Sequence, residues 1–195
     1  LSADELGPVR ADDDVFKHVE SRIVASNAIA RKAAENAMGH ISIALPDLEG
    51  EAVEVGARLA ELVMDQNDSI TGVTGGETVV TFDKDSADIS TSLGGRSQEL
   101  ALAFLVAMSG YAARGHKVPR FALLAGGTDG RDGPTDAAGA IVNHDMLAVG
   151  AALDEMREAL TKHNSYHALN NLAALIKMPP TGTNLGDLVI LKTDL

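Results

Sequence analysis

The chain has 195 residues, of which 45% are hydrophobic and 23% charged, so it can bury a substantial core and form one folded domain with an appended piece. A formal net charge of −12 and an aromatic content of 3% argue against a nucleic-acid-binding surface, which needs clustered cations and stacking rings. The absence of cysteine excludes disulfides and thiolate metal sites.

The sequence carries no targeting signal that we can identify. No apolar run is long enough to span a bilayer, and residues 1–14 are strongly acidic, unlike the basic start of a secretory signal. We therefore expect a cytoplasmic protein with no membrane partner. Because the first residue is Leu1 and not methionine, we also expect the chain to be an incomplete part of a longer protein.

Helix and strand patterns alternate along the chain after an irregular segment at 1–14. Helices are indicated by apolar residues that recur every three or four positions, and strands by short β-branched runs. Helices are predicted at 27–38, ended by Gly39, and at 51–65, 97–109, one or two places within 146–162, and 165–176. Strands are predicted at 22–26, 41–45, 70–73, 78–82, 121–127, 139–143 and 188–192.

This alternation predicts an α/β fold with three α/β/α layers and a mixed β-sheet. The helix at 97–109 is apolar on almost all sides, as a helix buried between layers should be. The polar stretch at 65–69 is the best candidate for a domain boundary.

Three glycine-rich segments carry the side chains that phosphoryl chemistry needs: GGRSQE at 94–99, GGTDGRDGPTD at 126–136 and PTGTNLGD at 180–187. Glycine lets the backbone approach an anion closely, while aspartate, threonine and arginine supply metal ligands, hydroxyls and a fixed cation. The chain contains no GxxxxGK[ST] loop, no GxGxxG after a strand and no GxSxG elbow, so the commonest phosphate, dinucleotide and hydrolase motifs are excluded.

The first segment places Arg96 at the N-terminus of a predicted buried helix, directly after Gly94 and Gly95. The helix dipole disfavours a cation there, unless an anion also binds to the guanidinium and to the free N–H groups. We therefore predict that Arg96, with the backbone of both glycines, binds a phosphate or a carboxylate. The alternative is a structural arginine that pairs with Glu99.

The second segment follows an apolar strand and contains Asp129 and Asp132, with Gly127 and Thr128 just before them. Ligands of α/β proteins bind at the carboxyl ends of strands, and Mg²⁺ usually takes one or two carboxylates together with water and phosphate oxygens. We predict that both aspartates hold Mg²⁺ and that the loop backbone binds nucleotide phosphates. The alternatives are an Asx-turn at Asp129 and a helix cap at Asp136.

The third segment offers backbone amides and side chains able to hold a carboxylate or phosphate, from Thr181, Gly182, Thr183 and Asn184. An ordinary connecting turn explains the same residues. Glu77, in the sequence TGGET, is a candidate for contact with a metal or a ribose, and β-turn chemistry explains the glycines beside it equally well.

Two histidines, His163 and His167, lie four residues apart and could share a helix face. The sequence HNSYH lacks the glutamate of a zinc-protease helix. We therefore expect surface or capping roles for both.

In order along the chain, GGRSQELALA, GGTDGRDGPTDAAGAIV, NSY and PTGTNLGDL resemble the C-terminal domain of glycerate 2-kinases, the group with the leucine-rich MOFRL domain, over about 72–191. The resemblance implies transfer of the γ-phosphoryl group of ATP, with Mg²⁺, to the 2-hydroxyl of D-glycerate. It also implies that 1–66 is the end of the family's N-terminal domain and that 67–195 is the MOFRL-type domain. Arg96 would then contact the transferred phosphoryl group or the glycerate carboxylate, and Asp129 with Asp132 would hold the metal.

The chain departs from the family pattern at Ser97, where asparagine is common, at Arg131, where an apolar residue is common, and at His163 and Asn164, where the family has NDSY. The N-terminal domain, with its catalytic lysine and a further glycine-rich loop, is absent. We therefore expect this chain to need that missing domain as a partner and to be inactive alone, and the sequence leaves a homo-oligomer open.

Two other functions remain open at this point. Relatives in this family are often labelled hydroxypyruvate reductase, which would use NAD(P)H, although the chain has no dinucleotide fingerprint. A non-catalytic regulatory or interaction domain is the other alternative.

Overall fold

The computed structural model describes residues 14, 25–82 and 92–194, so most of the predicted strand at 22–26 lies outside the described residues. The helices are α1 (Asn27–Met38), α2 (Ala52–Met64), α3 (Arg96–Ala113), α4 (Ala151–Thr161) and α5 (Ser165–Asn171), with a 3-10 turn η4 (His144–Met146). The strands are β1 (Thr71–Gly76), β2 (Arg120–Gly127), β3 (Gly139–Asn143), β4 (Leu175–Ile176) and β5 (Asp187–Asp194).

The five strands form one sheet in the order β1-β5-β2-β3-β4, and each pair of neighbours is antiparallel. Among the described residues, parallel pairing is limited to two isolated bridges, Leu48 with Gly76 and Glu51 with Val79. The α/β fold is therefore confirmed. The sheet is antiparallel and not mixed as predicted, because both parallel bridges are isolated and neither pairs two of the five strands.

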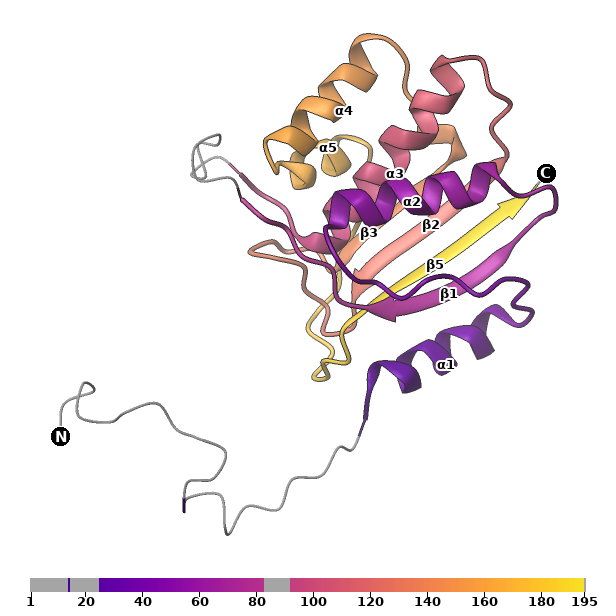
Figure 1. The fold of residues 1–195 in the computed structure, drawn as a ribbon. Coiled ribbons are helices and arrows are strands. Elements are labelled where there is room, and N and C mark those ends of the chain that lie inside the picture. The colour runs from indigo at the N-terminus through magenta and orange to yellow at the C-terminus, as the bar shows by residue number, and fades with distance from the viewer. Residues whose placement is uncertain (1–13, 15–24, 83–91, 195) are drawn as a thin grey trace.

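Helices cover both faces of the sheet (Figure 1). On one face α1 lies against β1 and β5, while α2 and α3 cover the other face and α4 and α5 pack beyond α3. Side chains of β1 alternate between the two layers: a Cβ on Gly75 would meet Asn27 of α1, and one on Gly72 would meet Leu45 on the opposite side. These layers are the predicted α/β/α arrangement.

The α3 helix is the centre of the main core. Phe104, Leu100 and Met108 of α3 are fully buried, together with Leu59 of α2 and Leu191 of β5. Because an apolar helix surrounded by sheet and helices buries its whole circumference, α3 shows no single polar face. This core contains residues on both sides of residue 66, and the domain division at that point stays a prediction.

Two elements have the predicted bounds, most others differ at their ends, such as α3, which extends to Ala113, and three predicted elements are absent, reduced or shortened. The helix at 27–38 ended by Gly39 and the strand at 139–143 are confirmed. The predicted strand at 41–45 is absent. Its contact with β1 is limited to Thr71, whose N–H donates to the Ser42 hydroxyl and whose carbonyl accepts from the Ser42 and Ile43 N–H groups. The predicted strand at 78–82 is reduced to the bridge at Val79. The predicted helix at 165–176 ends at Asn171, because Ala173 adopts a left-handed φ of 53° and the chain then forms β4.

Among the described residues, no helix has the length and apolarity to cross a bilayer.

Candidate active site

A cleft of about 510 Å³ opens at the N-terminus of α3. Strand pairing explains its position, because Gly127 at the end of β2 and Gly76 at the end of β1 both lie opposite Asp187, the first residue of β5. The loops that leave these three strand ends therefore meet beside Arg96 at the start of α3. The cleft is lined by Val80, Phe82, Ser92, Gly94, Gly95, Arg96, Glu99, Asp129, Arg131, Asp132, Gly133, Pro134, His163, Asn184 and Asp187.

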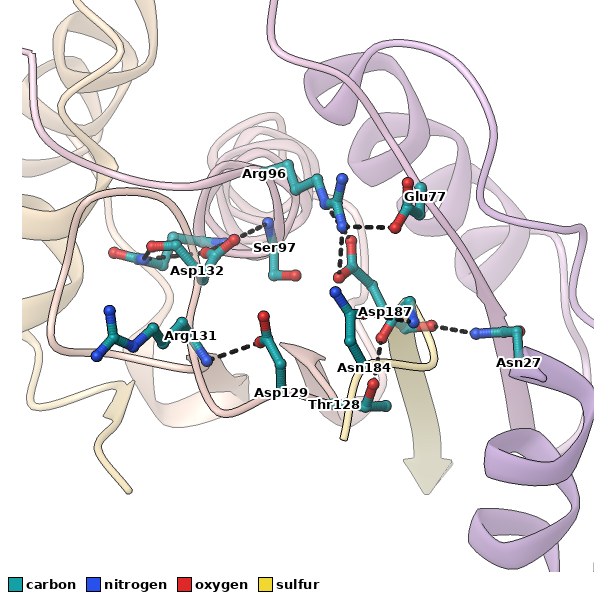
Figure 2. Close-up of polar contacts among 12 residues, drawn as sticks. Asn27, Glu77, Arg96, Ser97, Thr128, Asp129, Arg131, Asp132, Asn184 and Asp187 are labelled. Atoms are coloured by element: carbon teal, nitrogen blue, oxygen red, sulfur yellow. Dashed lines mark hydrogen bonds and ion pairs between the residues drawn. The ribbon is translucent and has the colours of Figure 1, made fainter. Parts of the chain in front are cut away.

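Arg96 is held by two carboxylates (Figure 2). Its Nε donates to Oδ2 of Asp187 at 2.6 Å, and its Nη2 donates to Oδ1 of Asp187 at 3.1 Å and to Oε1 of Glu77 at 3.0 Å. The predicted alternative partner, Glu99, instead contacts His163. The bidentate pair fixes the guanidinium plane at the cleft wall.

Asp187 is buried, with 5% of its surface exposed. Burial raises the pKa of its carboxyl group, while the Arg96 guanidinium acts in the opposite direction. Behind it, the amide Nδ2 of Asn27 donates to the carbonyls of Leu185 at 2.8 Å and Asp187 at 3.0 Å. Sequence analysis missed both residues, since Asn27 is about 160 positions from its partners and only the tertiary fold brings them together.

Asp132 caps α3 from another part of the chain. Its Oδ1 accepts from the Ser97 N–H at 3.1 Å, and its Oδ2 accepts from the Gln98 N–H at 2.8 Å and from Gln98 Nε2 at 2.9 Å. Burial raises the pKa of Asp132, and the Gln98 and Ser97 N–H donors oppose that rise. With three donors on a buried carboxylate, Asp132 satisfies the free N–H groups of the helix, so the geometry does not favour the predicted metal role.

Asp129 faces the cleft (Figure 2). Its Oδ1 accepts from the Arg131 N–H at 2.9 Å, which is the Asx-turn that the sequence left open, and its Oδ2 makes no hydrogen bond with any described residue. Nowhere in 25–82 or 92–194 do three or more His, Asp or Glu side chains gather to hold a metal. Asp129 is thus a single carboxylate with one oxygen available to a ligand.

The remaining polar residues of the loop after β2 and the loop before β5 either join the two loops or line the cleft. Thr181 Oγ1 donates to the Thr128 carbonyl at 2.6 Å, and Thr128 Oγ1 donates to the Gly186 carbonyl at 2.8 Å, so these predicted ligand-binding hydroxyls join one loop to the other. Asn184 lines the cleft. The other predicted positions in these loops lie outside the lining that the described residues form: Gly127, Gly182 and Thr183.

Gly94 and Gly95 line the cleft and also pack closely on neighbouring loops. A Cβ on Gly95 would lie 2.3 Å from Cγ of Asp132, and one on Gly94 would lie 2.2 Å from Oγ of Ser165. Their glycine character is therefore explained by packing, whether or not their N–H groups bind an anion.

Glu99 and His163 form a pair at the cleft that the sequence did not indicate. His163 Nδ1 lies 3.0 Å from Oε1 and 3.2 Å from Oε2 of Glu99, which is 3% exposed. Burial raises the pKa of Glu99, and His163 opposes the rise. The ring of Phe82 lies 4.7 Å from the imidazole, centroid to centroid.

Asp136 does not cap a helix, because no helix follows it. Its Oδ1 accepts from the Tyr166 hydroxyl at 2.7 Å and its Oδ2 from Lys177 Nζ at 3.0 Å. Asp136 thus connects its loop to α5 and to the residue directly after β4, outside the cleft.

Comparison with known proteins identifies the family. The model of the MOFRL family matches residues 70–187. The chain belongs to the MOFRL family. A D-glycerate 2-kinase of Thermotoga maritima is 41% identical over 119 residues, which are 60% of this chain and 25% of that protein. A putative hydroxypyruvate reductase of Agrobacterium vitis is 35% identical over 192 residues, which are 93% of this chain and 46% of that protein.

A solved structure gives the same fold. The crystal structure of glycerate kinase from Thermotoga maritima matches with a TM-score of 0.66 and 31% identity, over 86% of this chain and 39% of that chain. This MOFRL chain therefore spans less than half the length of these relatives. The MOFRL resemblance and the glycerate kinase relatives that the sequence predicts are confirmed.

Proposed function

We propose that this chain carries the C-terminal part of the active site of a glycerate 2-kinase, which phosphorylates D-glycerate at its 2-hydroxyl with ATP and Mg²⁺. The observation that carries the proposal is the cleft in which the arginine of the GGRSQE segment, the aspartate of the GGTDG segment and the asparagine of the PTGTN segment come together. Names of the longer relatives support it. Phosphoryl transfer depends mainly on positioning and charge neutralisation, and this cleft offers groups for both.

Arg96 is the proposed contact for the transferred phosphoryl group or the substrate carboxylate. Because Asp187 takes Nε and Nη2, the Nη1 edge of the guanidinium has no hydrogen bond among the described residues. An anion can thus bind at Nη1 without displacing Asp187. Gly94 and Gly95 lie beside it at the start of α3, where Asp132 already takes the Ser97 and Gln98 N–H groups, so the guanidinium is the proposed donor.

Asp129 is the proposed magnesium ligand. Mg²⁺ needs only one or two carboxylates when phosphate oxygens and water complete its octahedron, and Oδ2 of Asp129 is open to the cleft. When bound there, Mg²⁺ would neutralise phosphate charge. Asp132, which is engaged by three N–H donors, is assigned to the support of α3.

We propose that the other wall of the site comes from the N-terminal domain that longer relatives contain. Residues 1–66 would be the end of that domain and 67–195 the MOFRL-type domain. Because transfer requires donor and acceptor to be aligned between two walls, we expect the 195-residue chain to fold but to show no kinase turnover alone.

The test is ADP release from ATP with D-glycerate, measured for this chain alone and after addition of a separately produced N-terminal part from a longer relative. Turnover that needs both parts supports the proposal. Substantial turnover by this chain alone would disprove the division of the site, and NADH oxidation with hydroxypyruvate would replace the kinase with a reductase.

Arg96→Ala in the two-part enzyme should lower kcat by about 100-fold, because a fixed charge on the transferred group is lost. It should also lower stability by about 1–3 kcal/mol, since the buried Asp187 loses its partner. Arg96→Ala combined with Asp187→Asn removes the unpaired charge, so stability should recover while activity does not. Arg157→Ala, on an exposed face of α4, is the matched control and should leave both unchanged.

A further inference from the structure

The face of the sheet that carries α1 is covered over only part of its width. On this face α1 lies against β1 and β5, and Figure 1 shows no second helix of the described residues over β2 and β3. Residues paired directly across neighbouring strands point to the same face. The register therefore continues the row that begins under α1 as far as β3, through Val73, Ile190, Leu124 and Ile141.

Exposure along this apolar row rises with distance from α1. Val73 on β1 is 3% exposed, Ile190 and Leu124 are partly buried, and Ile141 on β3 is 42% exposed. The neighbour of Ile141 in the same strand, Val142, points to the other face and is fully buried. Contiguous apolar surface of this kind is rare on proteins that act alone and is typical of contact with a partner.

The orientation of α1 follows from its charged flank. Arg31 Nη1 donates to Oδ1 of Asp47 at 2.7 Å. Asp47 precedes Leu48, which bridges to Gly76 on the outer edge of β1, the edge away from β5. The Arg31 flank of α1 is therefore directed toward that outer edge.

The opposite flank of α1 is apolar. Ile29, Ala33 and Ala37 recur every four residues, so they share one side of the helix, and all three are exposed, Ile29 at 53%. Because the Arg31 flank is directed to the outer edge of β1, this apolar flank is directed toward β5 and β2. We call the surface formed by this flank and the row on the sheet the open corner: Ile29, Ala33, Ala37, Ile190, Leu124 and Ile141.

The open corner has the dimensions of a site for one more helix. Packed helices lie about 8–10 Å apart, and neighbouring strands lie about 4.8 Å apart, so a helix beside α1 is displaced by about two strands. Since α1 lies against β1 and β5, that position is over β2 and β3. A helix there would contact the apolar flank of α1 and Ile141 at the same time.

We propose that the open corner binds an apolar helix face of the N-terminal domain that longer relatives contain. This inference rests on the proposed two-part enzyme and names the surface that joins its parts. The chain spans less than half the length of the relatives described above, so enough polypeptide is available in those proteins to supply the helix.

The position of α1 favours the N-terminal domain as the occupant. Asn27, the first residue of α1, donates to the carbonyls of Leu185 and Asp187, so the polypeptide before α1 joins the fold at the cleft end of this face. Ile29 is two residues further on. A domain attached there is held close to both the open corner and the cleft, and the proposed second wall of the cleft is thereby continuous with the open corner.

The charge of the open corner is also consistent with an apolar helix face. The protein has 28 acidic residues and a net charge of −12, yet none of the six residues of the open corner is charged. Lys192, one row further along β5, is exposed and begins a polar border. An apolar centre with a polar border is the usual composition of a protein interface.

Thiol labelling tests the proposal directly, because the chain has no cysteine. Ile141→Cys and Ile29→Cys are made in this chain alone and in a single polypeptide that joins it to a cysteine-free N-terminal part of a longer relative. Both thiols should react about 100-fold more slowly in the joined polypeptide, because the helix buries them. Val149→Cys, an equally apolar site that is 64% exposed before α4, is the matched control and should react at the same rate in both.

A charged variant gives the second measurement, with the two parts produced separately. Ile141→Asp should raise the concentration of the N-terminal part needed for half-maximal turnover by about 100-fold, because a carboxylate would have to enter an apolar interface. Turnover at saturation should stay unchanged, and Val149→Asp should match the wild type. Unchanged unfolding temperatures of both variants in the chain alone would show that the fold is intact.

The outcomes separate this proposal from the proposed function. Thiols that stay fully reactive in a joined polypeptide with kinase turnover would overturn the docking surface and leave the function standing. Protected thiols without kinase turnover would support the docking surface and reject the function. A dimer of this chain alone in sedimentation, dissociated by Ile141→Asp, would overturn the proposal in favour of a second copy as the occupant.

Discussion

Aspartate and glycine have different roles in two regions of the molecule. One region is the N-terminus of α3, and the other is formed by the loops after β2 and before β5. At the N-terminus of α3, Asp132 and Gly133 lie against the backbone of Gly94 and Gly95, and Asp132 accepts from the Ser97 N–H. In the loop after β2, Asp129 lines the cleft and keeps one oxygen free, and in the loop before β5, Gly182 has nothing within 4 Å of the position its Cβ would take. One motif, GGTDGRDG, thus supplies two aspartates three residues apart, Asp132 that caps α3 and Asp129 that faces the cleft with one oxygen free.

The difference comes from what the rest of the chain brings to each residue. The N-terminus of α3 has free N–H groups that need acceptors, and Asp132 is the carboxylate within their reach. Asp129 follows β2 directly and meets only the N–H of its own turn. A carboxylate is available for ligands where no helix terminus competes for it.

Asp132→Ala should produce the largest loss of stability, about 3 kcal/mol. The substitution leaves the buried N–H groups of Ser97 and Gln98 without an acceptor and removes a charge-assisted cap. Asp129→Ala removes one hydrogen bond at a partly exposed turn and should cost below about 1 kcal/mol. Urea unfolding of both variants measures the contrast, and equal losses would contradict the structural assignment of Asp132.

Gly133→Ala should come next, with a loss of about 2 kcal/mol or more. Gly133 has a φ of +62°, and a Cβ there would lie 2.1 Å from the Gly94 carbonyl oxygen. Gly182 also has a positive φ, +76°, but open space around it, so Gly182→Ala should show only the backbone cost of about 1 kcal/mol. If thermal unfolding gives the two variants the same loss, the close approach of the two loops is not a determinant of stability.

The sequence predicts the elements well where periodicity and end signals agree. The helix at 27–38, with Gly39 after it, and the strand at 139–143 have the predicted bounds. At 41–45 an apolar run forms no strand, and near Ala173 one left-handed residue ends the helical region. Neither outcome leaves a periodic signal in the sequence.

Within the site, motifs identify the loops but not the partners of their residues. Arg96 lies at the N-terminus of α3 as expected, yet its carboxylate partners, Asp187 and Glu77, belong to strand ends that only the sheet register brings together. The Glu99–His163 pair spans 64 positions and depends on the packing of the α4 end on α3. Sequence patterns report local geometry, so such long-range pairs are outside their reach.

Asp129→Asn in the two-part enzyme should raise the Mg²⁺ concentration for half-maximal activity by about tenfold, because a neutral amide binds a hard cation less well than a carboxylate. Maximal turnover at saturating Mg²⁺ should fall less. Asp136→Asn, which lies outside the cleft, is the control and should leave the magnesium dependence unchanged. An unchanged magnesium dependence in Asp129→Asn would reject the metal role of Asp129. Asp129 and Asp132 would then differ in burial and hydrogen bonding but not in a role in magnesium binding.

The smallest effect expected is a difference in the pH dependence of stability between Asp132 and Asp136. Burial raises the pKa of Asp132, so the native state keeps its proton to higher pH than the unfolded chain, whose aspartates titrate near 3.9. The contribution of Asp132 to the free energy of unfolding therefore falls as pH rises through the window above about 4.

The hydrogen bonds from Tyr166 and Lys177 lower the pKa of the exposed Asp136, so the unfolded chain binds more protons and the contribution of Asp136 is lost as pH falls below about 4. Relative to wild type, Asp132→Asn should gain stability with rising pH, whereas Asp136→Asn should gain it with falling pH. Urea unfolding between pH 3 and 6 measures both slopes. Slopes of the same sign would show that desolvation does not control the pKa of Asp132.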